Sequence, residues 1–168
     1  ARSLVLLRAS HKTPIGTLTV IAREQLVLAA GFGGYEAMLR GMDEKDSSLK
    51  LSSMKRIPVI SELIENYFDG ELTSLNSIAV SQPGQKFSQA AWKAMRKISP
   101  GKVLSYAELA AKAGSPSAVR AAGTACARNL IAPIIPCHRI VRTGGALGNY
   151  AYGLAAKEWL LRHEGFLK

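Results

Sequence analysis

The chain has 168 residues, of which 48% are hydrophobic and 20% are charged, a composition typical of a folded globular protein and not of a disordered one. Its apolar runs are too short to cross a bilayer, and the opening Leu4-Val5-Leu6-Leu7 is too short for the core of a signal peptide. Two cysteines, Cys126 and Cys137, do not make a disulfide framework, and the sequence has no Cys/His cluster with zinc-site spacing. We therefore expect an intracellular protein without a structural metal.

The net charge of +10 is unevenly distributed along the chain. Residues 1–81 contain nine Lys and Arg against nine Asp and Glu, whereas residues 82–168 contain thirteen against three. A basic excess confined to one half favours a nucleic-acid partner over a merely soluble basic surface. Membrane binding is not favoured, because no strongly basic amphipathic helix carries bulky apolar anchors.

The N-terminal half is predicted to be a small antiparallel sheet followed by a helix. Runs rich in Leu, Val, Ile and Thr, separated by turn signals, predict strands at residues 3–9, 17–22 and 25–31. A short helix and a loop are expected in residues 33–54, and a further strand near residues 78–80. Apolar residues at helical spacing after Pro58 predict a helix that stops at Asp69-Gly70. This half carries no candidate nucleophile, metal cluster or phosphate loop, and we interpret it as a scaffold.

A turn-rich break at residues 81–85 coincides with the change in charge and predicts a domain boundary, giving domains 1–81 and 82–168. An amphipathic helix with Phe87 and Trp92 on its apolar face should then end before Pro100. Two short helices around Gly114-Ser115-Pro116 have helix-turn-helix spacing, and Ser105 with Glu108 should form a capping box on the first. The second, residues 117–128, is rich in Ala and Gly, which favours close, sequence-independent approach to a nucleic-acid backbone. Its one long side chain in the middle, Arg120, would by itself be interpreted as a solvated charge.

The segment of residues 134–141 combines branched apolar residues with Pro136-Cys137-His138-Arg139. Branched residues on both sides predict a buried, strand-like segment, in which the imidazole and guanidinium need polar partners. A thiol next to a base suggests an activated nucleophile. A Cys-His pair alone, however, is more often a core cysteine followed by surface residues.

Three features around this segment can contribute to a site. Asn129 can clamp a turn through its amide, and Glu164, after a predicted helix at residues 154–163, can orient a histidine. The loop from Gly148 to Gly153 holds two aromatic residues and can wall a pocket for a planar ligand.

Taken together, these motifs resemble a known family. Residues 86–166 resemble the C-terminal domain of the O6-alkylguanine-DNA alkyltransferases, through Lys102–Tyr106, Ala118–Gly123, Asn129, Ile135–Val141, Gly148–Tyr150 and Lys157–Gly165. The N-terminal half resembles the family more loosely, through Thr13–Gly16 and Tyr67–Gly70. The resemblance implies an α+β fold, with a small RNase H-like antiparallel-sheet domain followed by a mainly helical domain that contains a helix-turn-helix.

The resemblance also implies a role for each site residue. Cys137 would accept the alkyl group from O6 of guanine, with O4 of thymine as a second candidate position, and His138 would act as its base through a water, oriented by Glu164. Asn129 would hold the surrounding segments, and Tyr106 would crowd the target phosphate and protonate the departing guanine. Arg120 would replace the flipped nucleotide in the base stack. The implied DNA-binding residues are Tyr106, Ser117, Ala118, Arg120, Ala121, Gly123 and Thr124. The implied pocket residues are Gly148, Asn149, Tyr150, Ala151 and Tyr152.

The chemistry agrees with these roles. Displacement at an O-methyl carbon suits a soft thiolate, and reaching O6 requires extrusion of the base from the duplex. The thioether product is stable, so each molecule would react once, as a monomer on double-stranded DNA and without a cofactor.

Three departures from the family pattern bear on the substrate range and on metal binding. Tyr152 is bulkier than the residue that some members carry, which argues against large O6 substituents such as benzyl. Ala132 stands where some members have Pro and should soften the pocket wall. Residues 1–81 contain no Cys for the structural zinc of some members.

Two other functions compete with this one. A non-catalytic module that binds alkylated bases would lack the reactive cysteine, which is present here as Cys137. A multi-turnover Cys-His hydrolase would leave the basic half unexplained. Cys126 is interpreted as a core thiol of the second helix.

Overall fold

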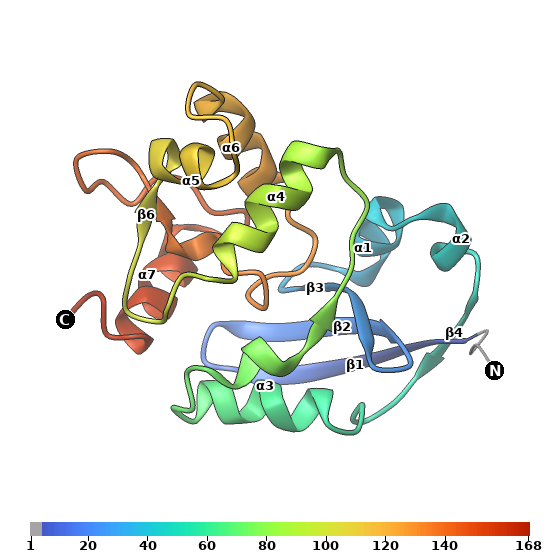
Figure 1. The fold of residues 1–168 in the computed structure, drawn as a ribbon. Helices are drawn as coiled ribbons and strands as arrows, with labels where there is room; N and C mark the ends of the chain where they lie inside the picture. The colour runs from blue at the N-terminus through green and yellow to red at the C-terminus, as the bar shows by residue number, and fades with distance from the viewer. Residues whose placement is uncertain (1–4) are drawn as a thin grey trace. The chain divides into compact units, whose positions relative to one another are not determined.

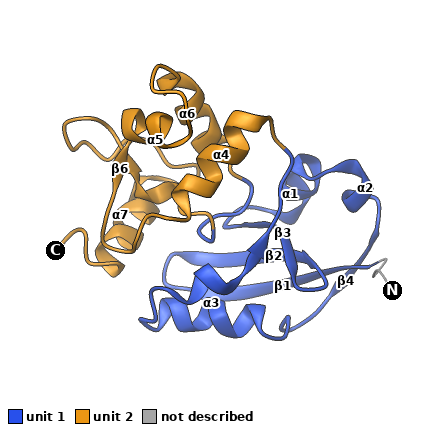
Figure 2. Cartoon of the chain, in the orientation of Figure 1, with its two compact units in different colours: residues 1–83, 130–134 blue, residues 84–129, 135–168 orange. Residues whose placement is uncertain are grey.

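The computed structural model describes residues 5–168, which form a mixed α+β protein with two compact units (Figures 1 and 2). Unit 1 comprises Ala1–Pro83 and Leu130–Ile134, and unit 2 comprises Gly84–Asn129 and Ile135–Lys168. The chain therefore crosses between the units three times. The predicted boundary after residue 81 lies close to the first crossing, but it did not include the return of residues 130–134 to unit 1.

That return is held by the backbone of β3. The Ala30 amide donates to the carbonyl of Leu130 at 2.9 Å, and the Ala132 amide donates to the carbonyl of Ala30 at 3.0 Å. Together these bonds form a parallel bridge between Ala30 and Ile131. Such pairing between residues far apart in the chain leaves no local pattern in the sequence.

Unit 1 is built on a five-stranded sheet with strand order β4-β1-β2-β3-β5. β1 pairs with β2 and β2 with β3 in antiparallel fashion, while β4 and β5 add in parallel at the two edges. The strands are β1 (Val5–Thr13), β2 (Gly16–Arg23), β3 (Leu26–Gly31), β4 (Lys50–Ser53) and β5 (Ala79–Val80). The three antiparallel strands and the strand near residue 79 are confirmed; residues 3 and 4 of the first predicted strand lie outside the described residues. β4 was not predicted, because its Lys-Leu-Ser-Ser sequence lacks the branched residues typical of strands.

The helices of unit 1 are α1 (Tyr35–Gly41), α2 (Glu44–Ser47), α3 (Ile60–Phe68) and a 3-10 turn η1 (Ser74–Ser77). Two of them, α1 and α3, pack on the sheet. In Figure 1, α3 runs alongside β1, and it buries Ile60, Ile64 and Tyr67 as the helical spacing after Pro58 predicted. α1 adds Met38 to a core cluster with Leu6, Ile21 and Leu28. The described residues contain no helix that is both long and apolar enough to cross a membrane.

Unit 2 consists mainly of helices. Its elements are α4 (Lys86–Met95), β6 (Leu104–Ser105), α5 (Tyr106–Lys112), α6 (Val119–Ala127), the 3-10 turn η2 (Cys137–Arg139), β7 (Ile140–Val141) and α7 (Leu154–His163). Trp92 of α4 is only 4% exposed, and its indole N–H donates to the carbonyl of Ala125 at 2.9 Å, which joins α4 to α6. A Cβ at Gly84 would lie 2.6 Å from the Trp92 ring, so this position requires glycine. The expectation that Trp92 belongs to the core is thus confirmed.

The helix pair α5 and α6 begins with the predicted capping box. The Ser105 hydroxyl accepts from the Glu108 amide at 3.0 Å, and the Glu108 carboxylate accepts from the Ser105 amide at 2.9 Å. α6 buries Ala122 and Ala125, so its small residues form a close packing face. The sequence of α7 predicts packing through Leu154, Trp159, Leu160 and Leu161; Leu160 and Leu161 are buried, whereas Leu154 is 49% exposed and does not pack in the core.

The segment around Cys137 is not the continuous strand that its branched residues predicted. Only Ile140–Val141 pair as a strand, in parallel with β6, whereas Cys137–Arg139 form a 3-10 turn. The turn is closed by the Cys137 amide, which donates to the carbonyl of Ile135 at 2.9 Å, and by the Arg139 amide, which donates to Pro136 at 3.0 Å. Pro136 itself has no N–H for a strand ladder. Local turn bonds therefore override the strand propensity here.

A buried hydrogen-bond chain in unit 1 should contribute measurably to stability. His11 Nδ1 donates to the Leu18 carbonyl at 3.1 Å, so Nε2 accepts from the Ser61 hydroxyl at 2.7 Å, and Ser61 Oγ in turn accepts from the Ile57 amide at 2.8 Å. Ser61→Ala leaves two buried groups without a partner, and we expect a loss of about 2 kcal/mol in the free energy of unfolding, measured by urea denaturation. Ser10→Ala, on the exposed face of β1, is the control, and equal losses in both variants would contradict this account.

Candidate active site

Cys137 lies at the bottom of a cavity of about 820 Å³ in unit 2. The residue is 7% exposed and belongs to the turn η2, which places its side chain at the end of an apolar segment. The cavity lining combines the exposed face of α6, the first residue of α5, and the segments after β7. The lining residues are Tyr106, Val119, Arg120, Gly123, Thr124, Cys126, Ala127, Cys137, Arg142, Asn149, Tyr150 and Ala151.

Different neighbours of Cys137 shift the pKa of its thiol in opposite directions. Burial raises the pKa of the thiol, and this is the largest effect. A hydrogen bond with the Asn129 side chain and the positive charge of Lys157 lower it. The resting residue is therefore a protonated thiol with groups already in place that favour the thiolate.

His138 is fully buried and is held in one tautomer. Its Nε2 lies 2.8 Å from Glu164 Oε2, and an ionised carboxylate can only accept, so Nε2 carries the hydrogen. Nδ1 is then the unprotonated nitrogen, and it has no hydrogen-bond partner within residues 5–168. Burial lowers the pKa of His138, which keeps the imidazole neutral and able to accept a proton.

Glu164 joins His138 to Arg139. Arg139 Nε donates to Glu164 Oε1 at 2.8 Å, and its Nη2 donates to Oε2 at 2.9 Å, a bidentate pair. A third donor, Nη1, reaches the Ile98 carbonyl at 2.6 Å. The charges and hydrogen bonds of His138 and Arg139 hold the pKa of Glu164 well below its usual range, against the opposing effect of burial. The expected pairing of Glu164 with a histidine is present, whereas the part of Arg139 was not assigned from the sequence.

Asn129 and Lys157 hold the segments that flank Cys137. The Asn129 amide donates to the Ile135 carbonyl at 2.8 Å, as expected for a residue that clamps a turn. The ammonium of Lys157, also buried, donates to the carbonyls of Ile140 at 2.6 Å and Asn149 at 3.2 Å. Lys157 thus ties the loop before α7 to the strand after Cys137.

Tyr106 stands at the cavity wall against Gly148. A Cβ on Gly148, whose φ is +76°, would lie 3.0 Å from the Tyr106 hydroxyl and 3.5 Å from Cγ of Arg142. Glycine is therefore required where this loop passes the phenol. Burial raises the pKa of Tyr106, so the phenol keeps its proton and remains a donor.

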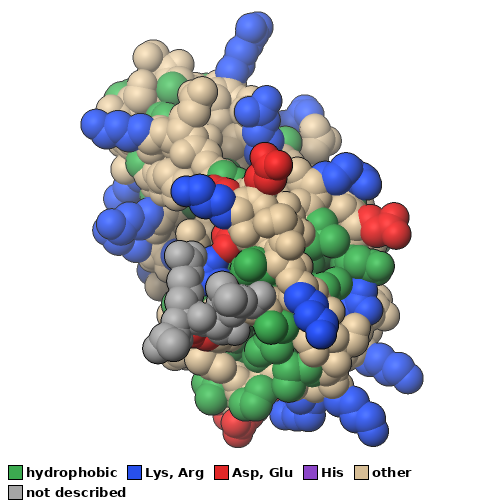
Figure 3. Space-filling model, turned by 90° about the vertical axis from the view of Figure 1, so that its right-hand side faces the viewer, with side chains coloured by type: hydrophobic (Ala, Val, Ile, Leu, Met, Phe, Trp, Pro, Cys, Tyr) green, Lys and Arg blue, Asp and Glu red, His purple; other side chains and the backbone are tan. Residues whose placement is uncertain are grey.

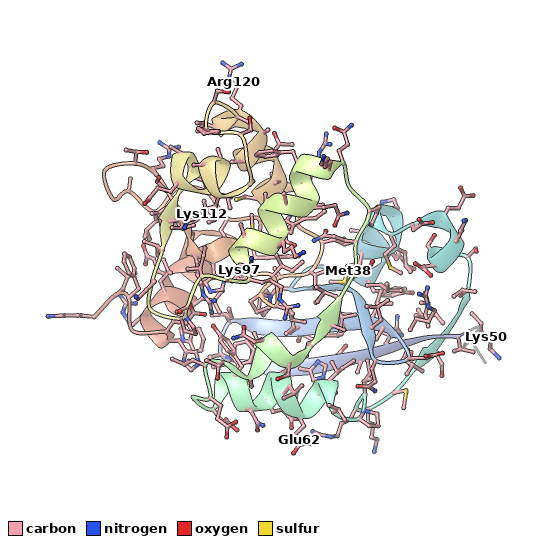
Figure 4. The ribbon with its side chains drawn as sticks, in the orientation of Figure 1. Met38, Lys50, Glu62, Lys97, Lys112 and Arg120 are labelled. Atoms are coloured by element: carbon pink, nitrogen blue, oxygen red, sulfur yellow. The ribbon has the colours of Figure 1, made fainter. Side chains whose placement is uncertain are left out.

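The predicted DNA-binding residues divide into two groups. Arg120, Gly123 and Thr124 line the cavity on α6 with Tyr106, and Arg120 projects from the outer end of the helix (Figure 4). Ser117, Ala118 and Ala121 do not line it. These three residues lie on the approach to α6 and on its half-buried side.

The loop at residues 148–153 contributes one wall. Asn149, Tyr150 and Ala151 line the cavity, while Gly148 and Tyr152 do not. The Tyr152 ring packs edge-on against the Tyr150 ring, with centroids 5.7 Å apart. Tyr152 is thus not among the lining residues but packs against Tyr150, which is.

The match to known proteins covers this whole arrangement. Residues 86–166 match the family model of the 6-O-methylguanine DNA methyltransferase DNA-binding domain. The methylated-DNA–protein-cysteine methyltransferase of Salmonella typhimurium is 35% identical over 168 residues, covering 98% of each chain. This chain belongs to the methylated-DNA–protein-cysteine methyltransferase family. The human protein with the same name is 53% identical over 77 residues, which are 46% of this chain and 37% of the human one.

Solved structures of the family have the same fold. Mycobacterium tuberculosis OGT in complex with DNA matches with a TM-score of 0.80 and 29% sequence identity, covering 95% of this chain and 92% of that one. The O6-methylguanine-DNA methyltransferase of Pyrococcus kodakaraensis is 21% identical with a TM-score of 0.74, a likeness of fold alone. Within the described residues, no group of three or more His, Cys, Asp or Glu side chains could hold a metal ion.

Sequence reasoning missed or misplaced three residues of this family member. Cys126 is a half-buried residue of the cavity lining and is not simply a core thiol, and burial raises its pKa strongly. Arg142, exposed after β7, lines the same cavity. Ala132 was expected to soften the pocket wall, but it is not among the lining residues and pairs with β3 in unit 1. A helical wheel of α6 could have placed Cys126 on the side of Gly123 and Ala127, whereas Arg142 has no local signal.

Glu164→Gln should destabilise the protein strongly. The substitution leaves the buried Arg139 guanidinium without its counter-charge, and we expect a loss of about 3–5 kcal/mol in the free energy of unfolding, measured by urea denaturation at pH 7. Because the folded protein lowers the pKa of Glu164, the contribution of this carboxylate is fully present above the usual Glu range and is lost as the pH falls from that range through the lowered pKa of the folded state. In the Glu164→Gln variant, the free energy of unfolding should therefore also depend less on pH in the acidic range.

The control for this variant is Glu158→Gln. Glu158 is a half-buried carboxylate on α7 for which the described structure gives no ion pair, and its replacement should change stability little. Similar losses in Glu164→Gln and Glu158→Gln would contradict the importance of the buried cluster.

Proposed function

We propose that this protein repairs alkylated duplex DNA directly, by transferring a methyl group from O6 of guanine to Cys137. The observation that carries the proposal is the position of the Cys137 thiol at the bottom of a cavity bordered by the exposed face of α6. His138, the next residue in the chain, is buried and hydrogen-bonded to Glu164. A thiol alone would not suggest transfer from DNA, and a helix of small residues alone would not suggest chemistry. Their meeting in one cavity suggests both.

The transfer begins with removal of the thiol proton. His138 Nδ1 takes this proton through a bridging water, and Glu164 stabilises the imidazolium that forms. Asn129 and Lys157 stabilise the thiolate. The role of base fits Nδ1, since Nε2 is already committed to the carboxylate.

Transfer then exchanges one bond for another. The Cys137 sulfur forms a bond with the methyl carbon, the bond between that carbon and O6 breaks, and the bonding pair remains with guanine. Tyr106, which its raised pKa keeps protonated at neutral pH, hydrogen-bonds to the departing base and donates its proton as negative charge develops there. The thioether has no leaving group of comparable quality, so each molecule reacts once.

The guanine reaches the cavity by leaving the base stack. We propose that α5 and α6 act as a helix-turn-helix in the minor groove, where Gly123 and Thr124 allow close approach to the backbone. Arg120, at the edge of the cavity, enters the space left by the flipped nucleotide. Asn149, Tyr150 and Ala151 then enclose the base, and O4-methylthymine is a second candidate substrate.

The remaining expectations belong to the same proposal. Unit 1 acts as a scaffold, and its β3-β2-β1-β4 strand order supports an RNase H-like arrangement. The protein works inside the cell as a monomer on double-stranded DNA and needs no cofactor for the transfer described above.

Intact-mass spectrometry tests the transfer. Incubation with a duplex that contains one O6-methylguanine should add about 14 Da to the protein, mapped to Cys137 and limited to one equivalent, because the acceptor is consumed. Cys137→Ser should bind the same duplex and gain no mass. Tight binding by the unaltered protein without a mass change would instead indicate a module that binds alkylated bases and does not repair them.

Arg120→Ala should impair capture of the lesion in duplex DNA. Without a side chain to replace the flipped base, the rate constant of transfer from duplex should fall by about ten- to a hundredfold, since unstacking costs a few kcal/mol. Transfer from a single-stranded oligonucleotide, where little stacking is lost, should change much less. Arg128→Ala, an exposed arginine at the end of α6, is the matched control. Equal rates for Arg120→Ala and Arg128→Ala on duplex would exclude the proposed role.

A further inference from the structure

Unit 2 contains a second groove, which shares no lining residue with the cavity of Cys137. This groove, of about 610 Å³, lies along α4, the segment that follows it, and the end of α5. Its apolar floor includes Ile98, Val103 and Leu104. We name it the lysine groove, because four exposed lysines line it: Lys93, Lys97, Lys102 and Lys112.

The lysines of this groove have little acidic compensation. None of the four forms an ion pair or a side-chain hydrogen bond in the described structure. Unit 2 contains three carboxylates, and Glu164 is buried with Arg139, while Glu158 lies on α7. The third, Glu108, caps α5 one turn before Lys112, while the buried Glu164 is paired with Arg139, which also binds the carbonyl of Ile98 in the groove floor. Lys93, Lys97 and Lys102 therefore repel one another without a counter-charge, which an anionic occupant would relieve.

The lining also indicates the kind of anion. Lysine ammonium groups are compact point charges that bind phosphates, and four of them around one groove suit a row of phosphates. The lining contains no aromatic residue on which an unpaired base could stack. These features favour the sugar–phosphate backbone of a duplex as the occupant, bound without regard to sequence. They argue against a single strand, whose bases would find no aromatic ring to stack on.

The groove also lies away from the residues that meet the first DNA segment. Lys97 and Lys112 lie beside α4 and the end of α5, whereas Arg120 projects from the outer end of α6 (Figure 4). Elsewhere the surface drawn in Figure 3 carries scattered basic side chains with few acidic ones among them. What distinguishes the lysine groove is that its charges surround a concave site.

We propose that the lysine groove binds the backbone of a second duplex DNA segment while α6 holds the first. The first contact rests on the proposed function; the second does not depend on methyl transfer. Holding two segments raises the local concentration of DNA at the protein, so release from one segment is followed by capture on the next. The groove would thus serve transfer between DNA segments during the search for a lesion.

The test uses two short duplexes with different fluorescent labels, one carrying O6-methylguanine and one unmodified, mixed with the full chain at low salt. Analytical ultracentrifugation should find both labels in a complex with one protein chain. Lys97→Glu with Lys102→Glu should weaken binding of the unmodified duplex about tenfold or more, and should reduce the slope of log K against log salt by about 2. Lys112 is left unchanged, because a glutamate there would also repel Glu108.

The control reverses two lysines of unit 1, Lys45→Glu with Lys50→Glu. Both are exposed, so the change in net charge is the same, and the second duplex should remain bound. The neutral pair Lys97→Gln with Lys102→Gln should cause an intermediate loss of affinity for the unmodified duplex. This pair tests the role of the charges even if the Glu variant does not fold. All of these variants should still transfer methyl from a short duplex to Cys137, so failure of the groove and failure of the repair function can be distinguished.

Several results would overturn the proposal. These are a complex with only one duplex per chain, a complex that needs two chains to hold two duplexes, or equal losses in the groove and control variants. Displacement of the unmodified duplex by poly-glutamate at matched charge, with tighter binding than DNA, would identify an acidic protein segment as the occupant.

Discussion

The active site depends on one buried carboxylate. Glu164 accepts from His138 and, through two oxygens, from Arg139, and Arg139 also binds the carbonyl of Ile98. A buried guanidinium and a buried carboxylate are each costly to place in a protein interior, and here each offsets the other. The same pair determines which nitrogen of His138 carries its hydrogen. The burial of two charges and the tautomer of His138 are therefore set by a single cluster.

Around that cluster, hydrogen bonds fix the segments on both sides of Cys137, and a cavity opens next to its thiol. Asn129 and Lys157 bind backbone carbonyls on both sides of Cys137, so the thiol sits on segments that are tied in place. Burial raises the pKa of Cys137, which protects an idle thiol from adventitious alkylation and oxidation. The cavity in front is bordered by the small residues of α6 and by the loop that carries Tyr150. The thiol is thus buried, and the cavity that leads to it is bordered by α6 and by the loop before α7.

The positive charge of the chain serves more than one purpose. Some of the basic residues of unit 2 are structural, since Arg139 and Lys157 are buried and hydrogen-bonded. Others, such as Arg120 and Arg142, face the cavity of Cys137. The lysine groove is a third group, which shares no lining residue with the cavity of Cys137, although the buried Arg139 binds the carbonyl of Ile98 in its floor. Net charge alone cannot separate these groups, because the distinction depends on burial and on neighbouring carboxylates.

Local patterns in the sequence were sufficient for most elements. The capping box of Ser105 and Glu108, the helix after Pro58 and the three antiparallel strands involve residues close in the chain, and each was predicted. The motif around Cys137 also pointed to a candidate site at that residue and its neighbouring histidine. Tertiary structure alone decided the rest: the turn at Cys137, the return of residues 130–134 to unit 1, the pairing of Arg139 with Glu164, and the meeting of Cys126 and Arg142 in one cavity. The reason is physical, since these contacts join residues distant in sequence through burial and hydrogen-bond geometry, neither of which has a periodic signature along the chain.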